Sequence, residues 1–437
     1  MIHPSSKGSR ADQAASGTPR RYRRGFVAAA GIACVALAAS ACGSSSSSKS
    51  SAASPSPAST AAPATSGSSG GSSSASLLPT ANPATAAAEG AAAGKQLGTA
   101  KLPQGKTIAY LRYIASDTSD QLDYQAFTAA AGALGWKVVQ CDGQGNPTVM
   151  LSCGHTLLAE HPDAFVDDGI PPSLIAPVLQ QAASEHIPTV SFSGTVSPCA
   201  PYSACYAAPD AQMGSLLAKW VAQKLSPLPA GQQQMIVQTF PSDWGNARVN
   251  AIAPALAGTQ VKVVAKPTAD ATNLVAGTQQ QVTDLTSQYP NAKAVWITFD
   301  GAASGAAQAV ATKYAGSHFP NAPMVVTFYQ EPETLQLIKK GEIAATVYES
   351  LGWNAFVTVD QLAEYFARNT PLSSASRPVY PGGNLQFWQP RIIDSSNVGS
   401  GAYPASPVDY PAYFAAKWKA EFGVNDTSLA TALNPIP

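Results

Sequence analysis

From residue 106 onward, short apolar runs alternate with segments whose apolar residues recur at helical spacing. The expected strands are residues 107–113, 136–140, 164–166, 189–192, 234–239, 261–265, 294–298, 324–327 and 343–347. The expected helices are residues 122–134, 147–160, 173–186, 211–225, 246–257, 273–289, 302–314 and 332–340. Strands separated by helices form parallel sheets covered on both faces. Two such series predict an α/β fold with two doubly wound parallel-sheet lobes.

The first 41 residues have the pattern of a secretory signal peptide, with a basic stretch at 20–24 before an apolar run at 25–38. A single membrane anchor is the alternative, but a bilayer span needs about 20 apolar residues. The segment around Cys42 resembles the bacterial lipobox, whose cysteine receives lipid, although Leu37 lies five positions before Cys42 where the lipobox usually has leucine three before. We expect lipidation at Cys42 and anchoring to the outer face of the cell membrane, with plain secretion as the alternative.

Residues 42–104 are dominated by Ser, Ala, Gly and Pro. Such a segment has too little apolar surface to offset the entropy that its chain would lose on folding. We therefore expect a disordered linker after the lipidated cysteine, which holds the folded part away from the membrane.

Charge and cysteine content narrow the class of protein. Removing residues 1–41 takes away six of 26 basic and one of 26 acidic residues, which leaves 20 against 25 and a net charge of −5. A mildly acidic surface argues against a nucleic-acid partner.

Four cysteines remain after Cys34 and Cys42, and their spacing favours the pairs Cys141–Cys153 and Cys199–Cys205 among three possible pairings. The spacing is not that of a zinc site, and no metal is assigned.

Four segments in register resemble the type I periplasmic binding proteins of the ribose- and galactose-binding group, which feed ABC importers. They are residues 132–139, 187–192, 294–306 and 340–347. The resemblance implies two lobes joined by a hinge, each assembled from separate segments. Lobe one is expected at 105–209 plus 349–371, and lobe two at 210–348 plus 372–437. Within the second segment of lobe two, 385–393 is similar to the family's closing strand, and 410–422 is an expected helix that packs on one lobe.

The resemblance also assigns ligand-binding residues to strand ends, because ligands of doubly wound folds bind there. The candidates are Asp117, Asp168, Arg248, Asp300, Glu349, Trp244 and Tyr329. Arg248 aligns with the family's arginine that holds ligand oxygens, and its planar fork of donors suits that role. The plain alternatives are a surface arginine at 248, a helix cap at Asp300, and ordinary packing for Trp244.

Departures from the family pattern leave the ligand open. Phe299 stands for the signature asparagine, and Ser119 with Asp120 stands for the paired aromatics of the first loop. Asp117, Asp168 and Glu349 replace amides, so the ligand is a sugar or polyol, or alternatively an amine or amino acid. A protein that reports to a membrane sensor is a further alternative to an importer subunit.

Catalysis is the rival class of function. The sequence lacks Gly-x-Ser-x-Gly and glycine-rich phosphate loops, and no histidine has a nucleophile–base spacing. Paired carboxylates for glycoside hydrolysis, such as Asp168 and Asp300, stay open. We therefore expect a monomeric binding protein without catalytic residues or cofactors, whose partners are a small ligand and ABC permease subunits. The ligand is expected to be captured by hinge closure of the two lobes around it.

Overall fold

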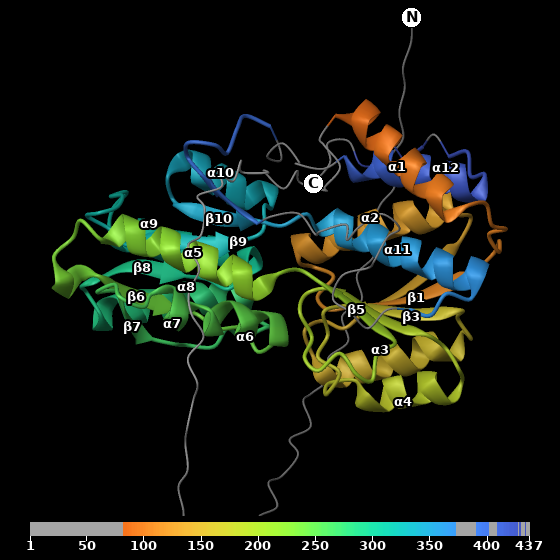
Figure 1. Ribbon diagram of the computed structural model, residues 1–437. Coiled ribbons are helices and arrows are strands. Elements are labelled where there is room, and N and C mark those ends of the chain that lie inside the picture. Colours follow the sequence, from red (N-terminus) through yellow and green to blue (C-terminus); the bar gives the residue numbers. More distant parts are fainter. Residues whose placement is uncertain (1–81, 373–389, 402–408, 427, 430–432, 434–437) are drawn as a thin grey trace, which may run out of the picture. The chain divides into compact units, whose positions relative to one another are not determined.

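The computed structural model describes residues 82–372, 390–401, 409–426, 428–429 and 433, all within the structural unit 72–437. The signal peptide expected at 1–41 and the lipidation site expected at Cys42 lie outside the described residues. The described residues form the two doubly wound parallel-sheet lobes that the sequence pattern predicts (Figure 1).

Lobe one contains a five-stranded, fully parallel sheet in the order β2-β1-β3-β4-β5. Its strands are β1 (Thr107–Arg112), β2 (Lys137–Asp142), β3 (Ala164–Asp168), β4 (Thr189–Ser193) and β5 (Ala204–Ala207). Helices α3 (Pro147–Ala159) and α4 (Ala176–Ser184) pack together, as do α2 (Thr118–Ala133) and α11 (Leu351–Arg368). Figure 1 shows these pairs on opposite faces of the sheet. Burial on both faces explains why the central strands are almost wholly apolar.

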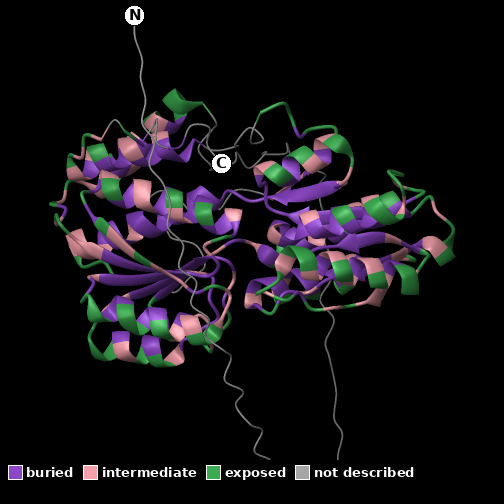
Figure 2. Ribbon diagram, turned by 180° about the vertical axis from the view of Figure 1, so that it is seen from behind, coloured by how far each residue is buried: buried purple, intermediate pink, exposed green. Residues whose placement is uncertain are grey.

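Lobe two contains six strands in the order β11-β10-β9-β8-β6-β7, of which only β11 is antiparallel to its neighbour. The strands are β6 (Gln234–Val237), β7 (Lys262–Ala265), β8 (Ala292–Trp296), β9 (Met324–Phe328), β10 (Ala345–Tyr348) and β11 (Arg391–Asp394). The helices are α5 (Asp210–Leu225), α6 (Asp243–Asn250), α7 (Ile252–Ala255), α8 (Leu274–Gln288), α9 (Ala303–Lys313) and α10 (Pro332–Lys340), with short 3-10 turns η1 (Ala230–Gln232) and η2 (Asp300–Ala302). Figure 2 shows the strands buried and the outer helix faces exposed.

The structure has a strand or helix at each segment where the periodicity predicts one. It differs from the prediction in one helix that is divided and in two elements that were not predicted. The helix expected at 246–257 is divided into α6 and α7, because Pro254 has no N–H to donate to the carbonyl of Asn250. Strand β5 and helix α11 were not singled out from the sequence. Strand β5 is a run of Ala, Cys, Tyr and Ala, without the Val or Ile residues that mark the other four-residue strands.

The predicted linker at 42–104 is wrong in its C-terminal part. Residues Pro83–Leu97 form helix α1, which Asn82 caps by accepting hydrogen bonds from two backbone amides. Helix α1 packs against α12 (Tyr410–Phe422), and the two lie side by side in Figure 1. A Cβ atom at Gly90 or Gly94 would overlap the backbone of α12. The small residues that suggested disorder thus allow the backbones of α1 and α12 to approach closely. A helix of this length is stable only when it packs against such a partner.

The prediction that all of 372–437 belongs to lobe two is also wrong. Strand β11 does pair with β10 of that lobe. Helix α12, however, packs on α11 and α1 of lobe one. Lys417 of α12 explains this placement, because its ammonium lies 2.7 Å from Asp360 Oδ1 and 3.1 Å from Glu364 Oε1, both on α11.

Both favoured cysteine pairs are disulfides in the structure. Cys141 of β2 is bonded to Cys153 of α3, with Cα atoms 5.5 Å apart, and Cys199 is bonded to Cys205 of β5, with Cα atoms 5.9 Å apart. Within the part of the chain that the structure describes, no helix has both the length and the apolar character needed to cross a membrane.

Candidate ligand-binding site

A cavity of about 50 Å³ lies between the strand ends of the two lobes. Both lobes contribute to its wall, and acidic and aromatic side chains predominate. The lining residues are Tyr113, Ile114, Asp117, Ser119, Asp120, Asp123, Asp168, Ser193, Gly194, Phe240, Trp244, Phe299, Tyr329 and Leu351. The first nine and Leu351 come from lobe one, and the other four come from lobe two.

Four aspartates give lobe one its share of the polar wall. Asp117 caps α2 by accepting a hydrogen bond from the Ser119 amide at 3.1 Å. Asp120 and Asp123 follow at intervals of three residues, which places them on the same face of the helix. Asp168 ends β3. The first three aspartates are 8%, 5% and 3% exposed, so their carboxyl groups lie almost entirely out of water.

Arg112 neutralises one of these aspartates. Its Nε donates to Asp120 Oδ1 at 2.5 Å, and the Ile114 amide donates to the other oxygen at 3.1 Å. Burial raises the pKa of Asp168 well above its usual range, and the negative charges of Asp120 and Asp123 raise it further. Asp168 and Asp120 are hydrogen-bonded to each other. Burial and the neighbouring negative charges therefore favour the protonated form of Asp168 beside Asp120.

Asp123 has no charged partner among the described residues. Its carboxyl group is hydrogen-bonded to Ser193, but Oδ1 is buried without any hydrogen-bond partner. Burial raises the pKa of Asp123 well above its ordinary value. Burial also raises the pKa of Asp117, to about 6, although hydrogen bonds from Ser119 oppose the shift. Both groups thus favour a proton, or another positive charge, in this conformation.

Lobe two contributes an aromatic wall. The rings of Phe240 and Trp244 stack with centroids 4.9 Å apart, and Phe299 meets Phe240 edge to face at 4.9 Å. Tyr113 of lobe one lies 6.0 Å from Phe240. An apolar wall of this kind excludes water, which strengthens every electrostatic interaction at the adjacent carboxyl groups.

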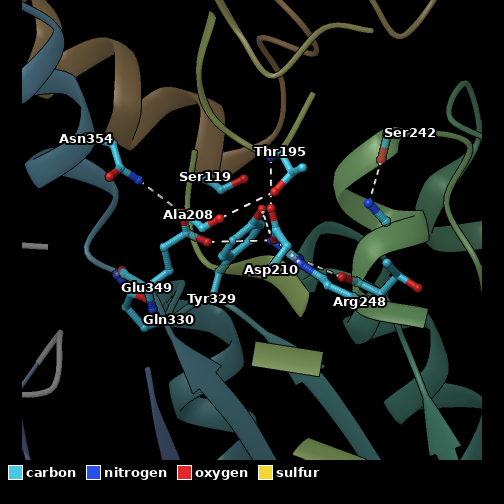
Figure 3. A network of polar contacts seen from close by, with 12 residues as sticks. Ser119, Thr195, Ala208, Asp210, Ser242, Arg248, Tyr329, Gln330, Glu349 and Asn354 are labelled. Atoms are coloured by element: carbon cyan, nitrogen blue, oxygen red, sulfur yellow. Dashed lines mark hydrogen bonds and ion pairs between the residues drawn. The ribbon is translucent and has the colours of Figure 1, made fainter. Parts of the chain in front are cut away.

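Arg248 has no exposed surface, and its guanidinium lies 4.9 Å from the ring centroid of Trp244 in the aromatic wall. Figure 3 shows Arg248 beside Asp210 and Tyr329. Its Nε donates to Asp210 Oδ1 at 2.7 Å, its Nη1 to the Thr298 carbonyl at 2.8 Å, and its Nη2 to the Tyr329 hydroxyl at 2.6 Å. Nη2 also lies 3.6 Å from Glu349 Oε2. Burial alone would lower the pKa of Arg248, but Tyr329, Asp210 and Glu349 hold it above its ordinary value. The guanidinium therefore remains charged and fixes the position of Tyr329.

Contacts across the cleft join the two lobes. Glu331 of lobe two accepts a hydrogen bond from the Ser119 amide of lobe one at 3.1 Å, and its own amide donates to Asp300 Oδ2 at 3.1 Å. A Cβ atom at Gly301 would overlap the Asp117 carboxylate, and one at Gly194 would overlap the Trp244 ring. The lobes thus come together where each presents a glycine to a side chain of the other.

Two lining residues have strained backbones at strand ends. Ser193 ends β4 with φ 68°, and Tyr329 directly follows β9 with φ 70°. A left-handed conformation is unfavourable for residues with a side chain and is often found at functional sites. Here it occurs once in each lobe, at the edge of each sheet that faces the cavity.

The structure brings four of the seven predicted ligand-binding residues to the cavity wall: Asp117, Asp168, Trp244 and Tyr329. Arg248, Asp300 and Glu349 lie directly behind it, with contacts to protein groups. Direct ligand contact by these seven stays a prediction. Trp244 already stacks on Phe240 and lies 4.9 Å from the Arg248 guanidinium, so packing accounts for much of its surface.

Sequence reasoning missed Asp120, Asp123 and the aromatic pair Tyr113 and Phe240. The two aspartates had a detectable signal, because acidic residues at 117, 120 and 123 share the helix face that continues into buried Phe127. The aromatic pair had none, since an aromatic residue just after a strand is ordinary core packing until the opposite lobe is placed.

The fold and the cleft define a class: two-lobed binding proteins that hold a small molecule between strand ends. Residues 108–369 match the family described as periplasmic binding protein domain, which is more than half of the chain. The chain belongs to this family. No curated protein matches it in sequence.

Solved structures with this fold include three informative relatives. An ABC sugar transporter subunit from Rhodobacter sphaeroides 2.4.1 is 20% identical with a TM-score of 0.56, covering 67% of this chain and 99% of that one. An ABC transporter solute binding protein from Mycobacterium smegmatis with bound glycerol is 18% identical with a TM-score of 0.58, covering 69% and 100%. A 5-methylthioribose transporter solute binding protein from Thermotoga lettingae, in complex with 5-methylthioribose, is 18% identical with a TM-score of 0.57, covering 76% and 98%. At these identities the likeness shows the fold.

Proposed function

We propose that the protein is an extracytoplasmic solute-binding lipoprotein of an ABC importer, which captures a small polar ligand between its two lobes. The observation that carries this proposal is the cavity that both lobes line, with carboxyl and hydroxyl groups at the strand ends. Related structures are of a sugar transporter subunit and of proteins that bind glycerol or 5-methylthioribose. These relatives favour a ligand rich in hydroxyl groups.

The proposed mechanism is hinge closure without chemistry. Sites for drug-sized ligands measure about 300–1,000 Å³. The present cavity of about 50 Å³ is much smaller, so a ligand enters after the lobes move apart. Closure then places strand-end groups around the ligand in place of water. Ligand shifts the equilibrium toward the closed form only because it binds that form more tightly.

Several contacts across the cleft are single hydrogen bonds between the lobes. The hydrogen bond from the Ser119 amide to Glu331 and that from the Ser197 amide to Asp243 at 3.0 Å are examples. Each is worth about 1 kcal/mol, or somewhat more because the acceptor is a carboxylate. Contacts of that size are compatible with opening, and a bound ligand would add to them.

The anchor and the linker complete the proposal. A lipidated Cys42 would hold the protein at the outer face of the membrane, since acylation supplies about 0.8 kcal/mol for each buried methylene. The linker between Cys42 and α1 would give the folded lobes reach toward a permease. Mass spectrometry of the membrane fraction tests this part, with Cys42→Ser as the variant that should be released from the membrane.

Thermal unfolding of the full chain in mild detergent tests the binding function. A ligand at 100 times its dissociation constant stabilises a protein by about 2.7 kcal/mol. We expect a clear increase in the unfolding temperature with at least one member of a panel of sugars, polyols, amines and amino acids. No shift with any member would contradict the proposal.

A glycine substitution tests whether closure is required. Gly301→Ala places a methyl group against the Asp117 carboxylate and should weaken binding of any panel ligand at least tenfold, with little loss of stability. Gly277→Ala is the matched control, because its Cβ atom in α8 meets only ordinary contacts at 3.6 Å or more. Equal affinity in both variants would argue against closure onto the ligand.

A further inference from the structure

The cleft has an excess of buried acid. Four aspartates line the cavity, and Asp120 alone among them has a salt bridge, to Arg112, within the part of the chain that the structure describes. Two further acids, Asp300 and Glu331, contact each other just behind Asp117. The second nearby cation, Arg248, already serves Asp210 and Glu349. The protein's own cations therefore leave several cleft carboxyl groups without a counter-charge.

Burial makes this arrangement costly in the absence of a ligand. Removing an ionised carboxylate from water without a partner costs several kcal/mol, and the group usually takes up a proton instead. Asp123 is 3% exposed and lines the cavity, yet its Oδ1 has no hydrogen-bond partner. Burial raises the pKa of Glu331 to about 8, with a further contribution from the charge of Asp117. An oxygen that is buried, unpartnered and at the cavity wall is a place for a donor from a ligand.

The shape of the site favours an organic cation over a metal ion. Among the described residues, three acids converge closely enough to hold a metal only at Asp360, Glu364 and Glu421, far along the chain from the cavity-lining aspartates. The cleft aspartates instead face an aromatic wall formed by Tyr113, Phe240 and Phe299. Carboxyl groups opposite aromatic rings suit a protonated nitrogen, which donates hydrogen bonds and is attracted to ring faces.

We propose that the ligand of this cleft is a small organic cation, a molecule with at least one protonated amino group that donates to Asp123 and Asp168. The inference rests on the proposed binding function and specifies its ligand class. A primary ammonium has three donors and no acceptor, so it satisfies Asp123 Oδ1 without adding another acceptor to an acidic site. Hydroxyl groups elsewhere on the same ligand would meet Asp117 and Ser119 at the start of α2.

Isothermal titration of the full chain at pH 7.5 tests the ligand class with pairs of probes that differ by one amino group. The pairs are D-glucose with D-glucosamine, and butane-1,4-diol with putrescine. We expect at least one amine to bind at least tenfold more tightly than its uncharged counterpart. We also expect proton release on binding, detected as a dependence of the apparent enthalpy on the ionisation enthalpy of the buffer, because the ammonium displaces protons from the cleft carboxyl groups.

Two variants assign the effect to the cleft. Asp123→Asn keeps the shape and removes the charge, so it should weaken binding of the amine at least tenfold more than it weakens binding of an uncharged probe. Asp168→Asn is the second variant, used if the first does not fold by circular dichroism. Asp284→Asn is the matched control, because Asp284 is exposed on α8 and its carboxylate accepts hydrogen bonds from Gln280 of the same helix.

The outcomes separate this inference from the function on which it rests. If an uncharged sugar or polyol binds as tightly as its amino counterpart, the organic-cation proposal is wrong and the binding function stands. If amine binding is the same in Asp123→Asn, Asp168→Asn and Asp284→Asn, the cleft assignment is wrong. If no probe binds and none shifts the unfolding temperature, the inference and the proposed function are contradicted together.

Discussion

Two regions of lobe one bury groups of carboxylates, which are unfavourable out of water unless they are paired or protonated. The two regions balance this negative charge in different ways. Between α11 and α12, the acids Asp360, Glu364 and Glu421 surround the Lys417 ammonium at 2.7, 3.1 and 2.8 Å. At the cleft, Asp117, Asp123 and Asp168 have no salt bridge to any described residue. The first region has its cations within the chain, whereas the carboxyl groups of the second need a proton or a ligand to balance their charge.

The neighbours of each region explain the difference in role. Arg368 adds a second cation to the α11–α12 cluster, with its Nη2 2.7 Å from Glu421 Oε1, and Trp418 Nε1 donates to Asp360 Oδ1 at 2.7 Å. Burial works against ionisation of Glu364, but Glu421 and Lys417 lower its pKa below the ordinary value. These ion pairs hold α12 on α11, and α12 in turn packs against helix α1. A network that lacks its cation is poorly suited to structure and well suited to binding.

The largest expected effect is the loss of the internal cation. Lys417→Met leaves three buried carboxyl groups around an apolar side chain and should reduce the free energy of unfolding by about 3–5 kcal/mol, as breaking a buried ion pair does. Urea unfolding at pH 7.5 measures the change. Lys419→Met, which replaces an exposed lysine on the same helix, should stay within about 0.5 kcal/mol of the wild type. Equal effects would remove the distinction between the two regions.

The second effect is a dependence on pH that belongs to the cleft. Burial raises the pKa of Asp117 from its ordinary value to about 6. A carboxyl group with a raised native-state pKa contributes stability that is present at low pH and is lost as the pH rises through that pKa. The free energy of unfolding of Asp117→Asn relative to wild type should therefore rise by about 2 kcal/mol from pH 4 to pH 7, at 1.36 kcal/mol per pKa unit, because the unfolded-state carboxyl group is already partly ionised at pH 4. A difference that is constant across this range would show that Asp117 is not so perturbed.

The third effect has the opposite sign from the first. Asp123→Asn removes a buried charge that has no cation and should increase the free energy of unfolding at pH 8 by about 1–3 kcal/mol, because an unpaired buried carboxylate costs more than the neutral amide that replaces it. Asp360→Asn removes one acid that does have a cation and should instead destabilise. The pair is compared by urea unfolding, and a loss of stability in both variants would contradict the inferred deficit of positive charge at the cleft.

The smallest effect is expected at Arg368, on the partly exposed edge of the cluster between α11 and α12. Arg368 is half-buried and pairs with Glu421 and Glu364, so Arg368→Gln should cost about 1 kcal/mol, near the upper end for exposed ion pairs. The loss should shrink in 1 M NaCl, because salt screens partly exposed charges. Urea unfolding at low and high salt measures it. A loss as large as that of Lys417→Met would mean that burial does not determine the strength of these pairs.

The sequence by itself determined the parts of this protein that local patterns encode. Alternating apolar strands and amphipathic helices predicted two parallel-sheet lobes, because side-chain periodicity follows directly from backbone geometry. Short cysteine spacings favoured the two disulfides that the structure contains. Acidic and aromatic residues at strand ends pointed to the cleft, because parallel strands end at one edge of a sheet.

Only the tertiary structure decided which groups meet across long separations. Residues 83–97 lack an apolar stripe of their own, and they fold because Gly90 and Gly94 fit against α12, more than 300 residues away. Arg248 was expected to contact ligand, yet its donors face Asp210, Thr298 and Tyr329. Asp123 likewise lacks a cation only because of where the cations of lobe one lie. Arg112 pairs with Asp120, and Lys417 pairs with the acids between α11 and α12. Hydrogen bonds and ion pairs form over about 3 Å, and sequence spacing does not determine distances on that scale between separate elements.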